Sequence, residues 1–352
     1  MKKIAIATVQ VPFITGGAEI HAKLLQQQLI KRGYLAEIVS HPFKWYPEKT
    51  LLQQLSLAQK IDLTEVAGQT IDQVISLKFP SYYCQANNKV GWILHQHRQA
   101  YDLYKSNHSD LHKTLLGRYA TYKIKQLDNH YLGKLSQQSR LFTNAQNVAD
   151  RLKRYNNIAA TALYHPPENY QQLYSSGSGD YILVPGRIEE LKRQQLIIQA
   201  LALSKSKHKL ILIGQQQTDY AKKLQQLVQQ SSLGHQVIFK GFVSQQEKID
   251  LYANAKAVYN GAQDEDYGYV TLEAFYARKP VITHTDSGGP LEFVRHHENG
   301  YIVAPDAQIL AELLNLLDNN NPQLSRYGEN GYQQMLDLKL NWDHIIDQLI
   351  LD

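Results

Sequence analysis

The chain has 352 residues, enough for two domains of ordinary size, and its 43% hydrophobic and 10% aromatic content is typical of a globular protein with buried cores. A single cysteine, Cys84, excludes an intramolecular disulfide and fits a reducing compartment. The net charge of +5 is unevenly divided: residues 1–170 hold 21 Lys and Arg against 11 Asp and Glu, and the remainder holds 16 against 21. This split predicts different partners for the two halves, with unspecific solubility charge as the alternative.

The sequence predicts no membrane-spanning helix, because no apolar run approaches the required length. The first residues, MKKIAIATVQVPF, superficially resemble a signal peptide. Their apolar core covers only residues 4–9, and no small-residue cleavage site follows. We therefore expect a first buried strand here and a cytoplasmic protein.

The first 40 residues predict a βαβ unit. Residues 3–9 are apolar and β-branched, as in a buried strand, and residues 18–29 have apolar side chains at helical spacing before Gly33 ends the helix. A second strand is predicted over 35–40. The turn before the helix carries Gly16 and Gly17, where backbone can approach a ligand closely. It lacks the G-x-G-x-x-G pattern that a nicotinamide dehydrogenase would need.

Two further strands are predicted over 71–77 and 89–94, and the second delivers His95, His97 and Arg98 at its carboxyl end. Open α/β sheets bind ligands at that edge, which makes these side chains candidates for a site, although a lone histidine is usually structural. One long helix or two over 111–138, a strand over 141–144 and a helix over 148–155 complete this half. The basic residues of the long helix do not share one face, so its apolar stripe favours core packing over a membrane anchor.

Pro166 and Pro167, followed by a stretch rich in Ser and Gly, mark the clearest domain boundary. We predict an N-terminal domain over 1–165, a linker over 166–180, a C-terminal domain over 181–335 and a final helical segment over 336–352.

The second domain opens with a strand over 181–185 and a strand-to-helix turn that carries Arg187 and Lys192. These two side chains can converge on one diphosphate and neutralise its charge as it departs, with a solvated Lys192 as the alternative. Further strands are predicted over 208–214, 237–242 and 257–260. Helices are predicted up to 203 and over 245–253, 309–317 and 333–351.

The stretch 258–306 carries two acids, Glu265 and Glu273, separated by seven residues. An apolar strand ending at residue 283, a turn with Gly288 and Gly289, and Glu292 follow. Backbone N–H groups and the dipole at a helix N-terminus favour anions, and a carboxylate can accept hydrogen bonds from two neighbouring hydroxyls. This combination suits a phosphorylated sugar. The alternative is an ordinary strand–helix–strand unit with solvated acids.

Three runs in this stretch, EDYGYVTLEA, KPVITHTDSGGPLEFV and ENGYIVAPD, together resemble the nucleotide-sugar site of retaining GT-B glycosyltransferases of the family 4 (group 1) type, with Tyr267 where phenylalanine is usual. The runs GGAEIHAKLLQQQLIKRGYLAEIV and GRIEELK resemble other parts of that family. The resemblance is strong over 181–306 and weak over 40–90 and 100–165. It implies an α/β GT-B fold: two Rossmann-like domains that face each other across a cleft, with a last helix that returns to the first domain.

The resemblance also implies roles for the matching residues. Arg187 and Lys192 would hold the donor diphosphate, Glu265 the sugar, and His95 would position that sugar; these four form the expected catalytic set. Val243 lies in the loop that would hold the base, and Glu273 would hold the ribose. The full donor-binding set is Gly16, Gly17, Arg187, Lys192, Val243, Tyr269, Val270, Leu272 and Glu273, and the acceptor side is expected to include His97 and Arg98. The leaving phosphate would help to deprotonate the acceptor, so neither a metal ion nor another cofactor is required.

The implied activity is transfer of a sugar, with retention, from a UDP- or GDP-sugar to an acceptor hydroxyl in polysaccharide, lipopolysaccharide or glycolipid synthesis. The expected partners are this donor and a saccharide or lipid-linked saccharide acceptor, without nucleic acid. The basic first half predicts peripheral contact with the inner face of a membrane. Two alternatives stay open: a GT-B-fold nucleotide-sugar epimerase or hydrolase, and a non-catalytic sugar-nucleotide-binding protein.

Overall fold

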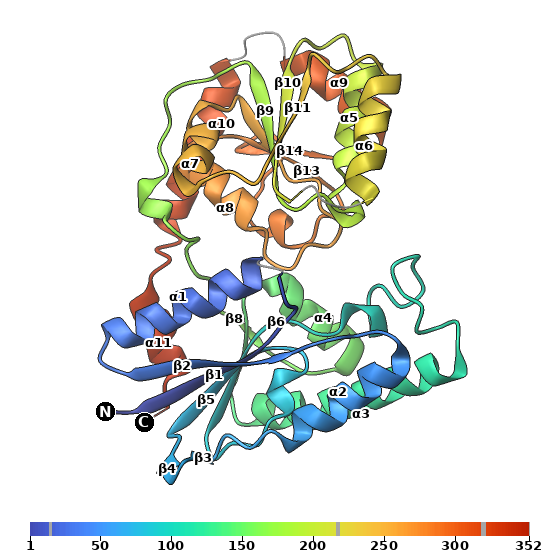
Figure 1. Cartoon of the computed structure of the whole chain (residues 1–352). Helices are drawn as coiled ribbons and strands as arrows, with labels where there is room; N and C mark the ends of the chain where they lie inside the picture. Colours follow the sequence, from blue (N-terminus) through green and yellow to red (C-terminus); the bar gives the residue numbers. More distant parts are fainter. Residues whose placement is uncertain (14–15, 216–218, 318–321, 352) are drawn as a thin grey trace. The chain divides into compact units, whose positions relative to one another are not determined.

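Two parallel sheets organise the chain, one in each of two units (Figure 1). The computed structural model describes residues 1–13, 16–215, 219–317 and 322–351. The first unit comprises Met1–Glu168 and Asn341–Asp352, and the second comprises Asn169–Leu340. In each unit helices pack against a six-stranded sheet, so the predicted class of two Rossmann-like α/β domains is confirmed.

The sheet of the first unit has the order β2-β1-β5-β6-β7-β8, and its paired strands are parallel. Its central strands β1, β5 and β6 are largely buried, as expected where helices cover both faces of a parallel sheet. The elements are β1 (Lys3–Gln10), α1 (Gly17–Lys31), β2 (Leu35–Pro42), α2 (Glu48–Lys60), β3 (Glu65–Val66), β4 (Gln69–Thr70), β5 (Gln73–Lys78), η1 (Ser81–Tyr83), β6 (Lys89–His95), η2 (Arg98–Ala100), α3 (Leu115–Gln137), β7 (Leu141–Thr143), α4 (Gln146–Asn156), β8 (Thr161–Ala162) and α11 (Trp342–Leu349).

Alternate residues of β6 contribute to two different cores, as the pleat of a strand requires. Trp92 belongs to a cluster that includes Leu25 of α1 and Ile345 of α11. Ile93 belongs to a second cluster, which includes Leu51 of α2 and Ile124 of α3. The C-terminal helix α11 is therefore part of the first unit's core, although more than 170 residues of the second unit precede it.

The second unit has the sheet order β11-β10-β9-β12-β13-β14, again with parallel pairs. Its largest core cluster joins the central strands to helices α5, α6, α9 and α10. The elements are η3 (Tyr170–Gln172), β9 (Tyr181–Pro185), η4 (Glu190–Lys192), α5 (Gln194–Leu203), β10 (Lys209–Ile213), α6 (Asp219–Gln230), β11 (Val237–Gly241), α7 (Gln245–Asn254), β12 (Ala257–Tyr259), α8 (Tyr269–Tyr276), β13 (Val281–His284), η5 (Gly289–Glu292), β14 (Gly300–Val303), α9 (Ala307–Leu317) and α10 (Pro322–Asp337).

Two helix predictions were wrong in their limits. The helix expected over 333–351 is two helices: α10 ends at Asp337, Lys339 has a φ of +47°, and the Asn341 side chain caps α11 by accepting from the His344 N–H at 2.8 Å. The helix expected from residue 111 begins only at Leu115, where the Thr114 hydroxyl accepts from the Gly117 N–H at 2.9 Å. In both places a capping side chain fixes the helix start.

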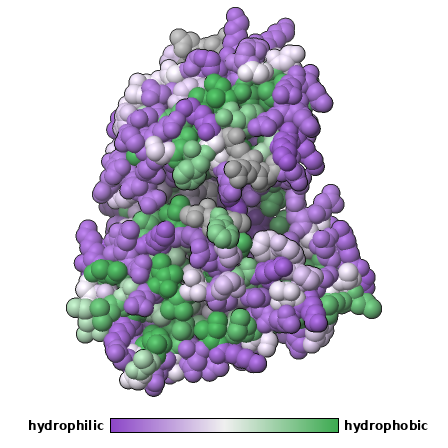
Figure 2. All heavy atoms as spheres, in the orientation of Figure 1, coloured by the Kyte–Doolittle hydropathy of each residue, from purple (hydrophilic) through white to green (hydrophobic). Residues whose placement is uncertain are grey.

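The surface mixes hydrophobic and hydrophilic residues on the face drawn in Figure 2. Among the residues that the structure describes, no helix combines the length and apolar character needed to cross a bilayer.

Candidate functional site

An ion pair between Lys192 and Glu265 joins two of the residues that the sequence singled out. Lys192 ends the short helix η4, and Glu265 lies on the loop between β12 and α8. The loop is tied to η4 by a hydrogen bond from the Gln263 N–H to the Leu191 carbonyl at 2.8 Å. The structure thus brings a cation and an acid, distant in sequence, to one place.

Backbone pairing holds Glu265 in position. Its N–H donates to the Ser287 carbonyl at 2.8 Å, and its carbonyl accepts from the Gly289 N–H at 2.8 Å. The close approach needs glycine at position 289, because a Cβ there would lie 2.6 Å from the Asp266 carbonyl oxygen. The Gly288-Gly289 turn noted in the sequence therefore serves as the frame that positions Glu265.

The helix α8 starts directly after this loop, with Gly268 as its N-cap at a φ of +83°. A Cβ at Gly268 would lie 2.9 Å from Pro290, so glycine is required here for both conformation and space. The first helical residues, Tyr269 and Val270, carry backbone N–H groups of the kind that form an anion site at a helix start. The Leu272 side chain is fully buried, so this residue can offer a ligand only its backbone.

Glu273, one turn into α8, is buried and held by two side chains of α7. Lys248 Nζ lies 2.6 Å from one carboxylate oxygen, and the Tyr252 hydroxyl donates to the other at 2.7 Å. Burial and the Glu273 charge raise the pKa of Tyr252 well above its usual value, so the phenol stays a donor. Neither partner was predicted from the sequence, although Lys248 and Tyr252 lie four residues apart on one face of a predicted helix.

The remaining donor-side candidates lie at the carboxyl ends of strands in the same sheet. Arg187 follows β9, has a half-exposed side chain, and its nearest acidic partner is Glu189 at 3.4 Å. It is not bonded to Lys192 or Glu265 in the described contacts, so its guanidinium can reorient toward a ligand. Val243 follows β11, beside the strongly exposed Phe242.

In the first unit, the turn that carries Gly16 and Gly17 is hydrogen-bonded to the helix α1 that follows it. The Gly16 N–H donates to Glu19 Oε2 at 2.8 Å, and Lys78 pairs with Glu19 at 2.8 Å. Gly16 is extended, with a φ of −146°, so its conformation does not by itself require glycine. Gly17 is the first residue of α1.

His95 is the last residue of β6 and is half-buried. Its Nδ1 lies 2.9 Å from the Gln96 carbonyl oxygen, which assigns the proton of a neutral ring to Nδ1 and leaves Nε2 as an acceptor. Gln96 in turn donates to buried Asp128 at 2.8 Å. His95 therefore has the tautomer needed to accept a hydrogen bond from a hydroxyl.

Asp128 organises a buried polar cluster beneath this segment. It accepts hydrogen bonds from the hydroxyls of Tyr82, Tyr83 and Tyr101 at 2.8, 2.6 and 2.7 Å, in addition to Gln96. Burial raises the pKa of Asp128, and the four donors oppose that rise. No sequence pattern indicated this cluster, because its members come from separate elements.

His97 and Arg98, which were expected on the acceptor side, both have partners within the first unit. The His97 ring is buried and stacks on Phe79 at a centroid distance of 4.9 Å, and burial lowers the pKa of His97 to about 3. Arg98 pairs with Asp102 at 2.6 Å. Their role toward an acceptor stays a prediction.

The described residues include no group of three or more His, Cys, Asp or Glu side chains arranged to hold a metal ion. The cations that stand near the candidate donor site are Arg187, Lys192 and Lys248.

Comparison with known proteins gives a family match for the second unit. Residues 167–334 match the family described as glycosyl transferases group 1. The alpha-1,3/1,6-mannosyltransferase ALG2 of Homo sapiens is 30% identical over 162 residues, which are 42% of this chain and 39% of the human protein. The matched part is thus about two fifths of that relative's length.

Solved structures resemble the whole chain. A sucrose-phosphate synthase from Thermosynechococcus elongatus has a TM-score of 0.76 at 17% identity, covering 99% of this chain and 97% of that one. Anabaena HepE, in a complex with UDP and glucose, has a TM-score of 0.69 at 17% identity and covers 99% of this chain and 98% of its own. These likenesses define the class as the GT-B fold. Together with the match of residues 167–334, they show a GT-B fold whose second unit resembles the group 1 glycosyl transferases.

Proposed function

We propose that the protein is a retaining glycosyltransferase that moves a hexosyl group from a nucleoside diphosphate donor to an acceptor hydroxyl. The observation that carries the proposal is the Lys192–Glu265 pair at the entrance to α8, with Glu273 held by Lys248 and Tyr252 further along the same helix. The match of residues 167–334 to the group 1 glycosyl transferases, the likeness to a mannosyltransferase and the fold shared with a UDP- and glucose-bound structure support it.

The second unit would hold the donor with groups already in place. The diphosphate would compete with Glu265 for Lys192 and draw in Arg187, while N–H groups at Tyr269 and Val270 face its charge. A carboxylate has about four lone-pair positions, so Glu273 can keep both protein partners and still accept ribose hydroxyls. The backbone around Val243 would hold the base.

The chemical step breaks the bond between the anomeric carbon and the phosphate oxygen and forms a bond from the acceptor oxygen on the same face. The acceptor proton passes to the leaving phosphate. Arg187 and Lys192 would stabilise the charge that develops on this phosphate, so the reaction requires no metal ion. Glu265, once released from Lys192, and His95 through Nε2 would accept hydrogen bonds from sugar hydroxyls and position the sugar.

Product analysis tests this function. The full chain is screened by thermal shift against UDP, GDP, ADP and their sugars, because a ligand of the native state raises the melting temperature. The donor that binds is then incubated with saccharide acceptors, and the anomeric proton of the product is followed by NMR. Retained configuration in a new glycoside is expected. If free sugar or an epimer is the only product, the enzyme is a hydrolase or an epimerase and not a transferase. Binding without turnover would indicate a non-catalytic protein.

We further propose that the acceptor is a saccharide or lipid-linked saccharide of the cell envelope and that the cytoplasmic enzyme contacts the inner membrane face. The motive is the start of α3, where Leu115, Leu116, Tyr119 and Tyr122 are exposed, the first by 82%, with Arg118 among them. Figure 2 shows hydrophobic atoms at the edge of the first unit where α3 begins. Such a face can enter a lipid interface, and each nearby basic residue adds about 1 kcal/mol on anionic lipid.

Liposome co-sedimentation checks the contact. Binding to anionic vesicles should fade as salt rises, and the double variant Leu115→Ser/Leu116→Ser should reduce it. Leu203→Ser, which changes an exposed leucine of the second unit, is the matched control. Equal, negligible binding to anionic and neutral vesicles at low salt would contradict membrane contact.

A further inference from the structure

A cavity of about 420 Å³ opens in the first unit, away from the residues assigned to the donor. One side is formed by Trp45, Tyr46, Pro47 and Glu48, and the other by Gln99, Asp110 and Leu111. The first segment follows β2 and the second follows β6, so both leave the carboxyl edge of the same sheet. Ligands bind at this edge in open α/β sheets, and the volume is in the range of small-molecule sites.

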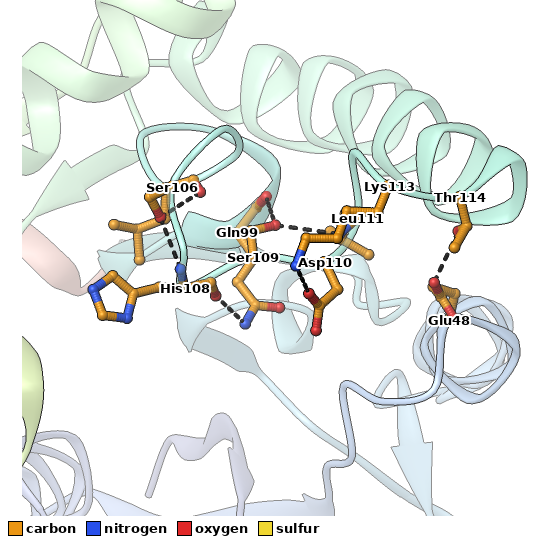
Figure 3. Close-up of polar contacts among 10 residues, drawn as sticks. Glu48, Gln99, Ser106, His108, Ser109, Asp110, Leu111, Lys113 and Thr114 are labelled. Carbon is orange, nitrogen blue, oxygen red and sulfur yellow. Dashed lines mark hydrogen bonds and ion pairs between the residues drawn. The ribbon is translucent and has the colours of Figure 1, made fainter. Parts of the chain in front are cut away.

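The polar wall of the cavity is fixed by its own hydrogen bonds (Figure 3). Gln99 Nε2 donates to the His108 carbonyl at 2.8 Å, and the Ser109 hydroxyl donates to the Gln99 carbonyl at 2.9 Å. The Thr114 hydroxyl donates to Glu48 Oε1 at 2.9 Å, which ties this wall to α2. A wall held in this way needs little ordering when a ligand binds.

The aromatic wall is equally supported. Trp45 lies beside Phe43 at a centroid distance of 6.3 Å, and Phe43 meets Phe79 edge-on at 5.8 Å. Phe79 carries the stacked ring of His97. Phe79 thus holds the His97 ring inside the first unit, and Phe43 supports Trp45 at the rim of the cavity.

Several hydrogen-bonding groups at the cavity remain available. Among the described contacts, neither the Trp45 indole N–H nor the Tyr46 hydroxyl has a hydrogen-bond partner, and Gln99 uses its amide nitrogen but not Oε1. Glu48 is bonded through Oε1 alone, and the Asp110 side chain, paired with Lys113, is 80% exposed. The two carboxylates disfavour a phosphate here. They favour a ligand that donates many hydroxyl hydrogens and has an apolar face for an aromatic ring.

We propose that this cavity binds a neutral pyranose unit of the acceptor saccharide. The ring lies against Trp45, and its hydroxyls donate to Glu48, Asp110 and Gln99 Oε1. The inference rests on the proposed transferase function and names the part of the chain that selects the acceptor.

The test uses methyl α-D-mannopyranoside, methyl α-D-glucopyranoside and methyl N-acetyl-β-D-glucosaminide as probes of the full chain, at millimolar concentrations. Binding is followed by saturation-transfer NMR and by tryptophan fluorescence. At least one glycoside should bind saturably, inorganic phosphate should not compete, and Trp45→Ala should weaken binding about tenfold or more. Glu48→Gln/Asp110→Asn, which keeps the aromatic wall, should weaken it as well. Tyr174→Ala and Glu37→Gln, exposed residues outside the cavity, are matched controls and should bind as wild type.

Nucleoside diphosphate affinity, measured by calorimetry on the same proteins, separates the two proposals. The cavity variants should keep it while they lose glycoside binding and raise the KM for acceptor. Glycoside binding that survives in both cavity variants, or no glycoside binding to wild type, would overturn the acceptor subsite even if the nucleotide binds. Absence of nucleotide binding to wild type would instead contradict the proposed function.

Discussion

The two units position their polar residues in different ways. In the second, the two acids of the E-x7-E pair each meet a cation from another element: Glu265 pairs with Lys192, and Glu273 pairs with Lys248. In the first, the candidates after β6 are tied into packing, with His97 stacked on Phe79 and Arg98 paired with Asp102. A site for a charged donor requires opposite charges at fixed places, whereas a site for neutral sugars can be built from ring faces and hydroxyl acceptors.

This difference explains which unit carries short sequence signals. The charge pairs of the second unit depend on a few particular side chains. These lie beside glycines that are needed because two backbone segments approach closely, as at Gly289. The first unit relies on surfaces assembled from separate loops. Substitutions in each unit test whether donor binding and acceptor selection divide between the units in this way.

The largest effect is expected from the cations of the second unit. Lys192→Ala should lower kcat by about 10²- to 10³-fold, and Arg187→Ala by about 10²-fold, because each removes a charge that stabilises the departing diphosphate. Steady-state kinetics with the identified donor measure this. Lys222→Ala, an exposed lysine of the same unit, serves as the control. Wild-type turnover in both folded variants would remove these residues from the mechanism.

Substitution of Glu273 and of Glu265 should have different effects on nucleotide affinity and on kcat. Glu273→Gln should weaken nucleoside diphosphate binding by about tenfold or more, because charged hydrogen bonds contribute about 1.5–3 kcal/mol. Glu265→Gln should leave that affinity nearly unchanged, or raise it by freeing Lys192, and should lower kcat. Equal losses of nucleotide affinity in the two variants would refute the division between ribose and sugar.

In the first unit, Asp128→Asn should reduce stability without changing nucleotide affinity. The amide leaves at least one buried tyrosine hydroxyl without its acceptor, at a cost of about 1–3 kcal/mol in the free energy of unfolding. All three tryptophans, Trp45, Trp92 and Trp342, belong to this unit, so urea denaturation followed by tryptophan fluorescence reports on it. Asp150→Asn, an exposed acid on α4, should leave the midpoint unchanged.

Acid should destabilise the first unit through its buried histidines. Burial lowers the pKa of His97 to about 3 and that of His165 to about 4, from 6.5. The unfolded chain therefore binds these protons first, so the stability contribution is complete above pH 6.5 and is lost as pH falls below it. Each histidine should cost up to about 1.4 kcal/mol per pH unit in that range. The same fluorescence assay should show a smaller loss in His97→Phe, and a midpoint independent of pH in wild type would contradict this.

A smaller effect is expected at His95. His95→Ala should lower kcat about fivefold to tenfold at saturating donor, the size of one lost neutral hydrogen bond, and should preserve folding. His97→Phe, which retains the stacked ring, should keep activity. Loss of activity in the His97 variant alone would reverse the assignment of these two residues.

Much of the second unit was predictable because its signals are local. The strand expected over 181–185 matches β9, and the strand expected over 257–260 contains β12. The helices α2 and α6 were missed, although Leu51, Leu55 and Ala58 in α2 and Ala221, Leu224 and Val228 in α6 are buried at helical spacing. Their glutamine-rich surroundings carry few start or stop residues.

The partners of the predicted acids could not be foreseen in the same way. Lys248 and Tyr252 reach Glu273 from a different helix, and the donors to Asp128 come from three separate segments. Such contacts depend on how the sheet brings elements together, which residue spacing alone does not specify. The ring contacts that support Trp45 are another example, because Phe43 follows β2 and Phe79 follows β5.

Calorimetric titration of UDP and GDP into wild type, Glu273→Gln and Trp45→Ala tests the central claim most directly. The account predicts that at least one nucleotide binds wild type, that Glu273→Gln weakens this binding about tenfold or more, and that Trp45→Ala leaves it unchanged. Nucleotide binding that is lost in Trp45→Ala but retained in Glu273→Gln would contradict a donor site built by the second unit.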